Sequence, residues 1–316
     1  MSGKSILCFL IALGTVGSAL LSPCAFGQKG SVSTNVDRGI SPAKGEWNRN
    51  FQVVTFPSGK LKLSGILWKP QGTGPFPAII YNHGSEKTVA NKAFAAIGNF
   101  YLSHGYAVLV PIRRGHSYQA NLQPVCSSEG TLFDDRVNQE TGFNFDPSKR
   151  NKIWIHEQEV DNEDVEAAAA WLRGQPFVNS KAMIMSGISF GGIQTCLASE
   201  KGLGMRAFIP FAPGAMSWKW VPEVHARLKQ ALEDAKAPVF LIQAENDYDT
   251  GPSEYLGPVL DRKGPPNRHK LYPAFHPEQG PAAGHGGFAT HGMEIWSADV
   301  SAFLQEAVGP VLPKLN

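Results

Sequence analysis

The stretch KAMIMSGISFGG, residues 181–192, decides the expected fold of this chain. Its apolar run suits a buried strand and stops at Gly187, and Ser189 follows in the pattern G-x-S-x-G. In this pattern the serine occupies a sharp strand-to-helix turn that exposes its hydroxyl, and the flanking glycines avoid clashes between closely packed backbone segments. Because the residues after Gly191 can continue as a helix, we interpret Ser189 as a nucleophile. A tight turn without chemistry is the alternative.

Strand and helix signals alternate along the rest of the chain. Strands are expected at residues 51–56, 61–68, 76–81, 107–111, 182–185, 207–211, 238–244 and 269–272. Helices are expected at 91–103, 159–173, 192–199, 222–236 and 293–308. This alternation predicts an α/β fold with a mostly parallel central sheet and helices on both faces, opened by an antiparallel hairpin. The polar segment 117–152 breaks the rhythm, and we expect a loop-rich insertion over the sheet edge.

Composition and charge bound the class of protein. The chain has 316 residues, of which 42% are hydrophobic, so it can bury a sizeable core. Residues 51–316 are expected to form a single domain. There are 29 basic and 27 acidic residues, and the basic ones do not cluster with aromatic residues, which argues against nucleic acid as a partner.

The first residues are of a different kind. Lys4 precedes an apolar stretch at 6–21, and small residues surround Gly27, as in a secretory signal peptide cleaved near Gly27 and Gln28. A membrane anchor is the alternative, but the stretch is shorter than the about 20 residues of a span. We therefore expect residues 1–27 to be removed, residues 28–50 to be a flexible lead-in, and the protein to be periplasmic or secreted without a stable membrane anchor. A lipid on Cys24 is a lesser alternative.

Cleavage would leave two cysteines, Cys126 and Cys196. An exported protein can join two cysteines in one disulfide, but both could equally be separate packed thiols.

A serine hydroxyl needs a base that takes its proton and an acid that orients that base. The strand at 238–244 runs into an acidic loop, and the carboxyl ends of parallel strands are where chemistry gathers in such sheets. Asp247 is the first candidate for the acid, followed by Asp249 and Glu245.

The chain order serine, acid, histidine restricts the base to four histidines: His269, His276, His285 and His291. His285 lies in the glycine-rich stretch AAGHGGF, which allows the backbone to bring the imidazole close to Ser189, and is our first choice. Two histidines without a third ligand nearby do not make a metal site, so no metal is expected.

Backbone N–H groups should stabilise the charge that develops on the substrate oxygen. Phe190, directly after the nucleophile, is one expected donor. The other comes from the loop after the strand at 76–81, where Ser85 is preferred and Glu86 is the second choice. His83 in this loop is interpreted as structural.

Three side chains are candidates for substrate contact: Arg113, Tyr248 and Trp218. Arg113 and Arg114 follow a strand end and could bind a carboxylate, although a structural salt bridge is the favoured role. The aromatic residues Phe133, Trp154, Trp218, Trp220 and Tyr248 could line an apolar site or belong to the core.

At this point the residues resemble the α/β-hydrolase superfamily, specifically its dienelactone-hydrolase-like and acyl-peptidase-like branch. The resemblance rests on GPFPAIIYNHG at 74–84, PIRRG at 111–115, GISFGG at 187–192, Asp247, and GHG at 284–286. It covers about residues 51–312 and implies the α/β-hydrolase fold, a Ser189, Asp247 and His285 triad, and an acyl-enzyme without metal or organic cofactor.

Two departures narrow the expected activity. Dienelactone hydrolases proper use a cysteine nucleophile, whereas this chain has Ser189. The related peptidases carry a propeller domain before the catalytic one, and only a few dozen residues precede it here. We therefore expect an exported hydrolase of small-molecule carboxylic esters. A peptidase or amidase with the same triad is the alternative, and a non-catalytic binding protein is the third interpretation.

Overall fold

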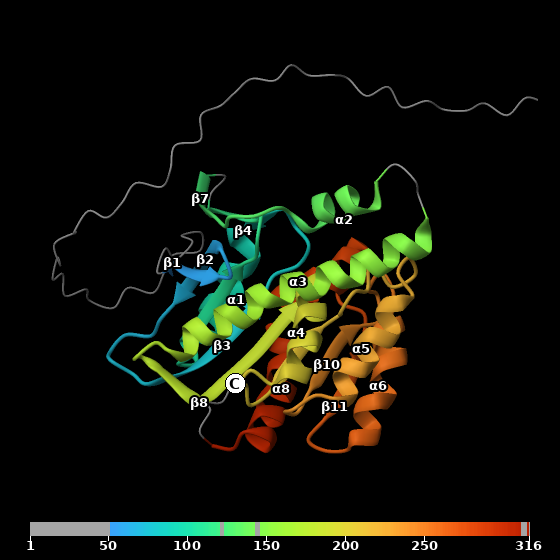
Figure 1. The fold of residues 1–316 in the computed structure, drawn as a ribbon. Helices are drawn as coiled ribbons and strands as arrows, with labels where there is room; N and C mark the ends of the chain where they lie inside the picture. The colour runs from blue at the N-terminus through green and yellow to red at the C-terminus, as the bar shows by residue number, and fades with distance from the viewer. Residues whose placement is uncertain (1–50, 121–122, 143–145, 311–314, 316) are drawn as a thin grey trace, which may run out of the picture. The chain divides into compact units, whose positions relative to one another are not determined.

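The computed structural model describes residues 51–120, 123–142, 146–310 and 315. The expected signal peptide, the lead-in and Cys24 lie outside the described residues. Eight strands form one sheet in the order β1-β2-β5-β3-β8-β9-β10-β11 (Figure 1). Their bounds are β1 Phe51–Ser58, β2 Leu61–Trp68, β3 Phe76–Asn82, β5 Ala107–Ile112, β8 Val178–Ile188, β9 Phe208–Phe211, β10 Phe240–Ala244 and β11 Arg268–Tyr272. Pairing is antiparallel at β1–β2 and β2–β5 and parallel from β5 to β11, so the predicted mostly parallel sheet is confirmed.

Helices cover both faces of the sheet, as expected (Figure 1). Their bounds are α1 Asn91–Ser103, α2 Phe133–Thr141, α3 Pro147–Arg173, α4 Phe190–Lys201, α5 Glu223–Glu233, α6 Gly251–Lys263, α7 Phe288–His291 and α8 Met293–Ala307. Side chains alternate along each strand, so Ile79 packs with α1, α7 and α8, whereas Ile80 packs with α3 to α6. Two separate cores therefore hold the sheet between two helical layers.

The segment 117–152 differs from the expected loop-rich insertion. It contributes β6 Ser117–Ala120 and β7 Gln123–Ser127, which pair with β4 Thr88–Ala90 in a small second sheet, and it then forms α2. It also holds the first turns of α3, which begins at Pro147 rather than at residue 159. Asp146 caps this helix by accepting hydrogen bonds from the backbone N–H groups of Ser148 and Lys149. In the first turns of α3 the buried side chains include the polar Asn151, Glu157 and Gln158, so residues 147–158 show little hydrophobic periodicity and did not predict a helix.

Helix α6 was not expected from the sequence. Pro252 lies in its first turn, where the missing N–H costs nothing, and Pro258 lies inside it. Its prolines and glycines, including Gly251 and Gly257, are poor helix formers, so the residue pattern of 251–263 gives no helix signal. Among the described residues, no helix is long and apolar enough to cross a membrane.

The sequence left open whether Cys126 and Cys196 form a disulfide. Cys126 and Cys196 are both buried, and they are not joined in a disulfide. They also belong to the two different cores of the sheet.

The strand order places a switch point at β3. The chain passes from β3 to β5 on one side and returns to β8 on the other side of β3. In open α/β sheets, ligands bind in the crevice outside the carboxyl ends of strands at such a point. The turn after β8 and the loop after β3 both lie at this crevice.

Candidate active site

Ser189 occupies a strained turn between β8 and α4. Its φ of 58° and ψ of −115° are rarely adopted by a residue with a side chain. The turn needs glycine on both sides, because a Cβ on Gly187 would lie 2.4 Å from the Gly191 carbonyl oxygen. A Cβ on Gly191 would lie 2.0 Å from the Asn82 carbonyl oxygen. Close packing of three backbone segments therefore forces the turn that presents Ser189.

A cavity of about 400 Å³ lies against this turn, and Ser189, Phe190 and Ser85 line it. Its apolar lining residues are Leu132, Phe133, Trp154, Ile193, Met216, Trp220 and Val221. The ring of Phe133 packs edge-on against the rings of Trp154 at 5.4 Å and Phe190 at 4.9 Å. Since Phe133 comes from α2, the segment that breaks the strand and helix rhythm builds one wall of the cavity.

Asp247 and His285 are hydrogen-bonded to each other. Nδ1 of His285 lies 2.7 Å from Oδ1 of Asp247, and the Asp247 side chain is fully buried. The same carboxylate accepts hydrogen bonds from the Tyr248 backbone N–H at 2.6 Å and from Nε2 of Gln243 at 2.8 Å. Gln243 is held in turn by the backbone N–H and hydroxyl of Ser253. The acid is therefore fixed in place before any substrate binds.

His285 lies in a single π-helical turn, Ala283–Gly287, rather than in the expected loop, and this turn fits closely against the loop after β10. A Cβ on Gly284 would lie 2.5 Å from Oδ1 of Asn246, so only glycine allows this approach. Because Nδ1 faces the carboxylate, a neutral imidazole carries its proton there and leaves Nε2 as an acceptor. Nε2 is buried and has no hydrogen-bond partner among the described residues, so the structure does not join it to Ser189 by a hydrogen bond. Unliganded sites often hold such pairs slightly apart.

Three of the competing acid and histidine candidates bind other partners. The Asp249 carboxylate accepts a hydrogen bond from the Gly251 backbone N–H and caps the start of α6. His276 pairs with Glu278, and His269 with Asp261. Among the described residues, no group of three His, Cys, Asp or Glu side chains could hold a metal ion.

The loop after β3 lies directly beside the nucleophile. A Cβ on Gly84 would be 3.9 Å from the Ser189 Cβ and 2.6 Å from Oε2 of Glu86. Burial raises the pKa of the Glu86 carboxyl. Ser85 lines the cavity together with Ser189 and Phe190, whereas Glu86 does not, so Ser85 stays the preferred donor in this loop.

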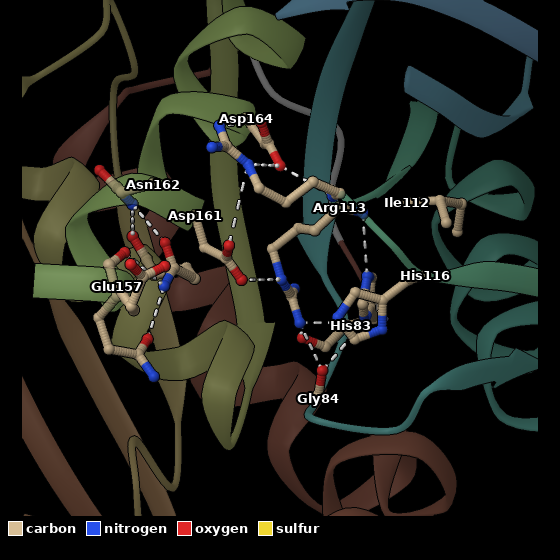
Figure 2. Close-up of polar contacts among 12 residues, drawn as sticks. His83, Gly84, Ile112, Arg113, His116, Glu157, Asp161, Asn162 and Asp164 are labelled. Atoms are coloured by element: carbon tan, nitrogen blue, oxygen red, sulfur yellow. Dashed lines mark hydrogen bonds and ion pairs between the residues drawn. The ribbon is translucent and has the colours of Figure 1, made fainter. Parts of the chain in front are cut away.

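Arg113 does not line the cavity, and of the two roles considered for it the structure supports the favoured salt bridge over contact with a substrate carboxylate. Its side chain is fully buried and hydrogen-bonds to the carbonyl oxygens of His83 and Gly84 (Figure 2). It also forms an ion pair with Asp161, at 3.7 Å from Nε to Oδ2. Burial, followed by the Arg113 charge, lowers the pKa of His83 well below its usual value and that of His116 to about 3. Both imidazoles are therefore neutral, as expected for a structural His83.

The two aromatic candidates for substrate contact have different positions. Trp218 is buried and stacks on His225 at 4.0 Å between centroids, away from the cavity, while Trp220 is 77% exposed at the cavity rim. The ring of Tyr248 packs edge-on against His285 at 5.4 Å and is 42% exposed. Tyr248 is therefore placed beside the proposed base, and Trp218 belongs to the core.

Sequence reasoning missed Gln243. It lies in the otherwise apolar strand β10, FLIQA, and its side chain is buried. A lone amide in such a run was the available signal, because a buried polar group needs hydrogen-bond partners.

No protein-family model and no curated protein matches this chain. Among solved structures, an esterase of Pyrococcus furiosus matches with a TM-score of 0.56 and 16% identity, over 82% of this chain and 92% of the esterase. An alpha/beta hydrolase from Penicillium sp. sh18 matches with a TM-score of 0.55 and 15% identity, over 82% of this chain and 99% of the hydrolase. An acylaminoacyl peptidase of Pyrococcus horikoshii matches with a TM-score of 0.56 and 20% identity, over 85% of this chain but only 44% of the peptidase.

At sequence identities of 15–20%, structural similarity supports a shared fold and nothing further. The three matches cover 82–85% of this chain at TM-scores of 0.55–0.56. This chain therefore has the α/β-hydrolase fold.

Proposed function

We propose that this protein is a serine hydrolase that cleaves carboxylic esters through an acyl-enzyme intermediate. The observation that carries the proposal is the buried Asp247–His285 hydrogen bond at the same sheet edge where a strained turn presents Ser189 to a cavity. The similarity to an esterase and to another hydrolase of this fold supports it.

The proposed reaction uses each group in one role. The Ser189 hydroxyl attacks the ester carbonyl carbon while Nε2 of His285 takes its proton. The charged oxygen accepts hydrogen bonds from the backbone N–H groups of Phe190 and Ser85. As the tetrahedral intermediate collapses, His285 gives the proton to the leaving alcohol. Water then attacks the acyl-enzyme in the same way and releases the acid, and Asp247 stabilises the protonated imidazole throughout.

The cavity indicates the kind of ester. About half of its lining residues are aliphatic or aromatic, and among them Met216 and Trp220 are exposed, while Lys87, Asp134 and Arg150 add charged groups. We therefore propose small-molecule esters with an apolar or aromatic group that fills this space. No metal or organic cofactor takes part in the proposed steps.

The test is hydrolysis of p-nitrophenyl esters and aminoacyl p-nitroanilides by the wild type and the Ser189→Ala variant. Ester turnover should fall by roughly 10⁴- to 10⁶-fold in the variant, as in serine hydrolases that lose the nucleophile. Ser103→Ala, on the exposed end of α1, is the matched control and should keep wild-type rates. Turnover of anilides in preference to esters would favour the peptidase. If the wild type showed no turnover and no labelling by a fluorophosphonate, the triad would be refuted and a binding role would remain.

We also propose that the protein is exported, on the pattern of residues 1–27. Mass spectrometry of the protein from its native host should find a mature N-terminus near Gln28. An intact Met1 terminus or a lipid on Cys24 would contradict this proposal.

A further inference from the structure

Arg113 connects the two segments that supply the proposed oxyanion donors. It directly follows β5, at the carboxyl edge of the sheet next to β3. Its Nη1 donates to the His83 carbonyl oxygen at 2.8 Å, and its Nη2 donates to the Gly84 carbonyl oxygen at 2.5 Å (Figure 2). Its guanidinium carbon lies 4.6 Å from the centroid of the Phe190 ring. One side chain thus touches both the loop after β3 and the first residue of α4.

The hydrogen bond to Gly84 has a geometric consequence for Ser85. The Gly84 carbonyl and the Ser85 N–H belong to one planar trans peptide group and point in opposite directions. Because Arg113 holds the carbonyl oxygen on the buried side, the Ser85 N–H is directed away from Arg113. Ser85 lines the cavity together with Ser189 and Phe190.

The histidine before this peptide is held in the same way. The Arg113 backbone N–H donates to Nε2 of His83 at 3.3 Å, so the neutral ring carries its proton on Nδ1. Nδ1 lies 2.9 Å from the Gly84 carbonyl oxygen and donates to it. The Gly84 carbonyl therefore accepts two hydrogen bonds, which fix the orientation of its peptide plane.

The guanidinium is anchored from the opposite side by α3. Asp161 pairs with Arg113 at 3.7 Å and also hydrogen-bonds to Arg136. The neighbouring Arg114 makes an ion pair with Asp164, at 2.7 Å between Nη2 and Oδ1. Within the part of the chain that the structure describes, the hydrogen bonds and ion pairs of Arg114 go to carboxylates of α3 and not to the loop after β3 or Phe190. Arg113 therefore links α3 to the loop after β3, whereas Arg114 binds α3 alone.

We propose that Arg113 is a positioning residue of the oxyanion hole, which aligns the Ser85 peptide and Phe190 so that their N–H groups converge on the substrate carbonyl oxygen. This inference rests on the proposed ester hydrolysis. A lysine cannot replace Arg113, because a single ammonium lacks the planar fork that reaches two carbonyl oxygens and stacks on a ring.

The test compares an oxygen ester with the corresponding thionoester, whose sulfur is a poorer hydrogen-bond acceptor, in Arg113→Met, Arg113→Lys and Arg114→Met. Loss of a whole oxyanion donor costs about 10²- to 10³-fold in kcat, so misalignment in both Arg113 variants should cost roughly 10- to 100-fold, with little change in KM. The oxygen-to-thiono ratio of kcat/KM should fall in parallel by about 10-fold. Arg114→Met should lower the melting temperature but keep the wild-type ratio.

Circular dichroism and thermal unfolding identify which variants are folded. Phe190→Leu keeps the backbone donor but removes the ring under the guanidinium, and should lower the ratio in the same direction even if Arg113→Met does not fold. A wild-type ratio in folded Arg113→Lys and Phe190→Leu would overturn the inference, and so would an equal fall in Arg114→Met. A wild type without ester turnover would instead overturn the proposed function and the inference together.

Discussion

Replacing Gln243 by leucine should weaken catalysis without touching any reacting group. Gln243 donates one hydrogen bond to Oδ2 of Asp247 at 2.8 Å and another to the Asp249 carbonyl oxygen at 2.7 Å. A hydrogen bond to a charged group contributes about 1.5–3 kcal/mol. If this is expressed wholly in the transition state, where Asp247 faces a protonated His285, kcat should fall roughly 10- to 150-fold. KM should change little, because Gln243 does not line the cavity.

The variant also has a cost in stability, which the assay must separate from catalysis. Leucine leaves the buried Ser253 N–H without its acceptor, and an unsatisfied buried group costs about 1–3 kcal/mol. Kinetics should therefore be measured at 25 °C on protein shown to be folded. Gln230→Leu is the matched control, since Gln230 makes a similar 2.7 Å hydrogen bond to Asp234 on the exposed face of α5. That variant should keep wild-type kinetics.

A second variant and a double mutant test whether Gln243 acts by positioning Asp247. Gln243→Glu keeps an acceptor for Ser253 but brings a second negative charge to Asp247, so it should lose more activity than Gln243→Leu at neutral pH. In the Ser189→Ala background, Gln243→Leu should have almost no further effect, because residues that act as one unit are not additive. An equal loss in both backgrounds, or full activity of Gln243→Leu, would refute the positioning role.

Two further predictions concern the fit of the His285 loop and the charge state of His116. Gly284→Ala would place a Cβ 2.5 Å from Oδ1 of Asn246, so it should displace His285 and lower kcat about 100-fold. Gly286→Ala is the control and should keep nearly wild-type kcat, because nothing lies within 4 Å of its Cβ. Equal kcat values for the two variants would contradict the close packing of Gly284 against Asn246. Burial lowers the pKa of His116 to about 3, so protonation of this imidazole opposes folding. The folded state therefore has its full stability above about pH 6.5, the ordinary pKa of histidine, and loses stability as the pH falls towards 3. From pH 7 to pH 5, the free energy of unfolding measured in urea should fall about 2 kcal/mol more for the wild type than for His116→Asn. If the free energy of unfolding changed with pH in the same way in both proteins, the His116 imidazole would not be held neutral.

Local patterns were enough to predict most of the sheet. The strands at 61–68, 76–81 and 238–244 were expected close to their observed bounds, because runs of apolar residues reflect burial on one or both faces. The same patterns failed in α3. The missed part, residues 147–158, buries the polar side chains of Asn151, Glu157 and Gln158, and the Glu157 charge is balanced by Arg136 from another segment, so the local hydrophobic period is weak.

In the candidate site too, some residues could be proposed from the sequence and others only from the structure. Ser189, Asp247 and His285 could be proposed from the sequence, because each follows a strand or lies in a glycine-rich loop whose backbone demands are local. Their catalytic roles remain predictions. Gln243 and the role of Arg113 could not be assigned, since a side chain alone does not show which backbone carbonyl or carboxylate it will meet.

The sequence by itself determined where the backbone turns and which polar residues follow the strands of an α/β sheet. These features depend on neighbours a few residues away, as the glycines around Ser189 show. Only the tertiary structure decided the partners of those residues. The pair Asp247 and His285 spans 38 positions, and Arg113 meets His83 across 30, so both contacts exist only after β3, β5 and β10 have taken their places in the sheet.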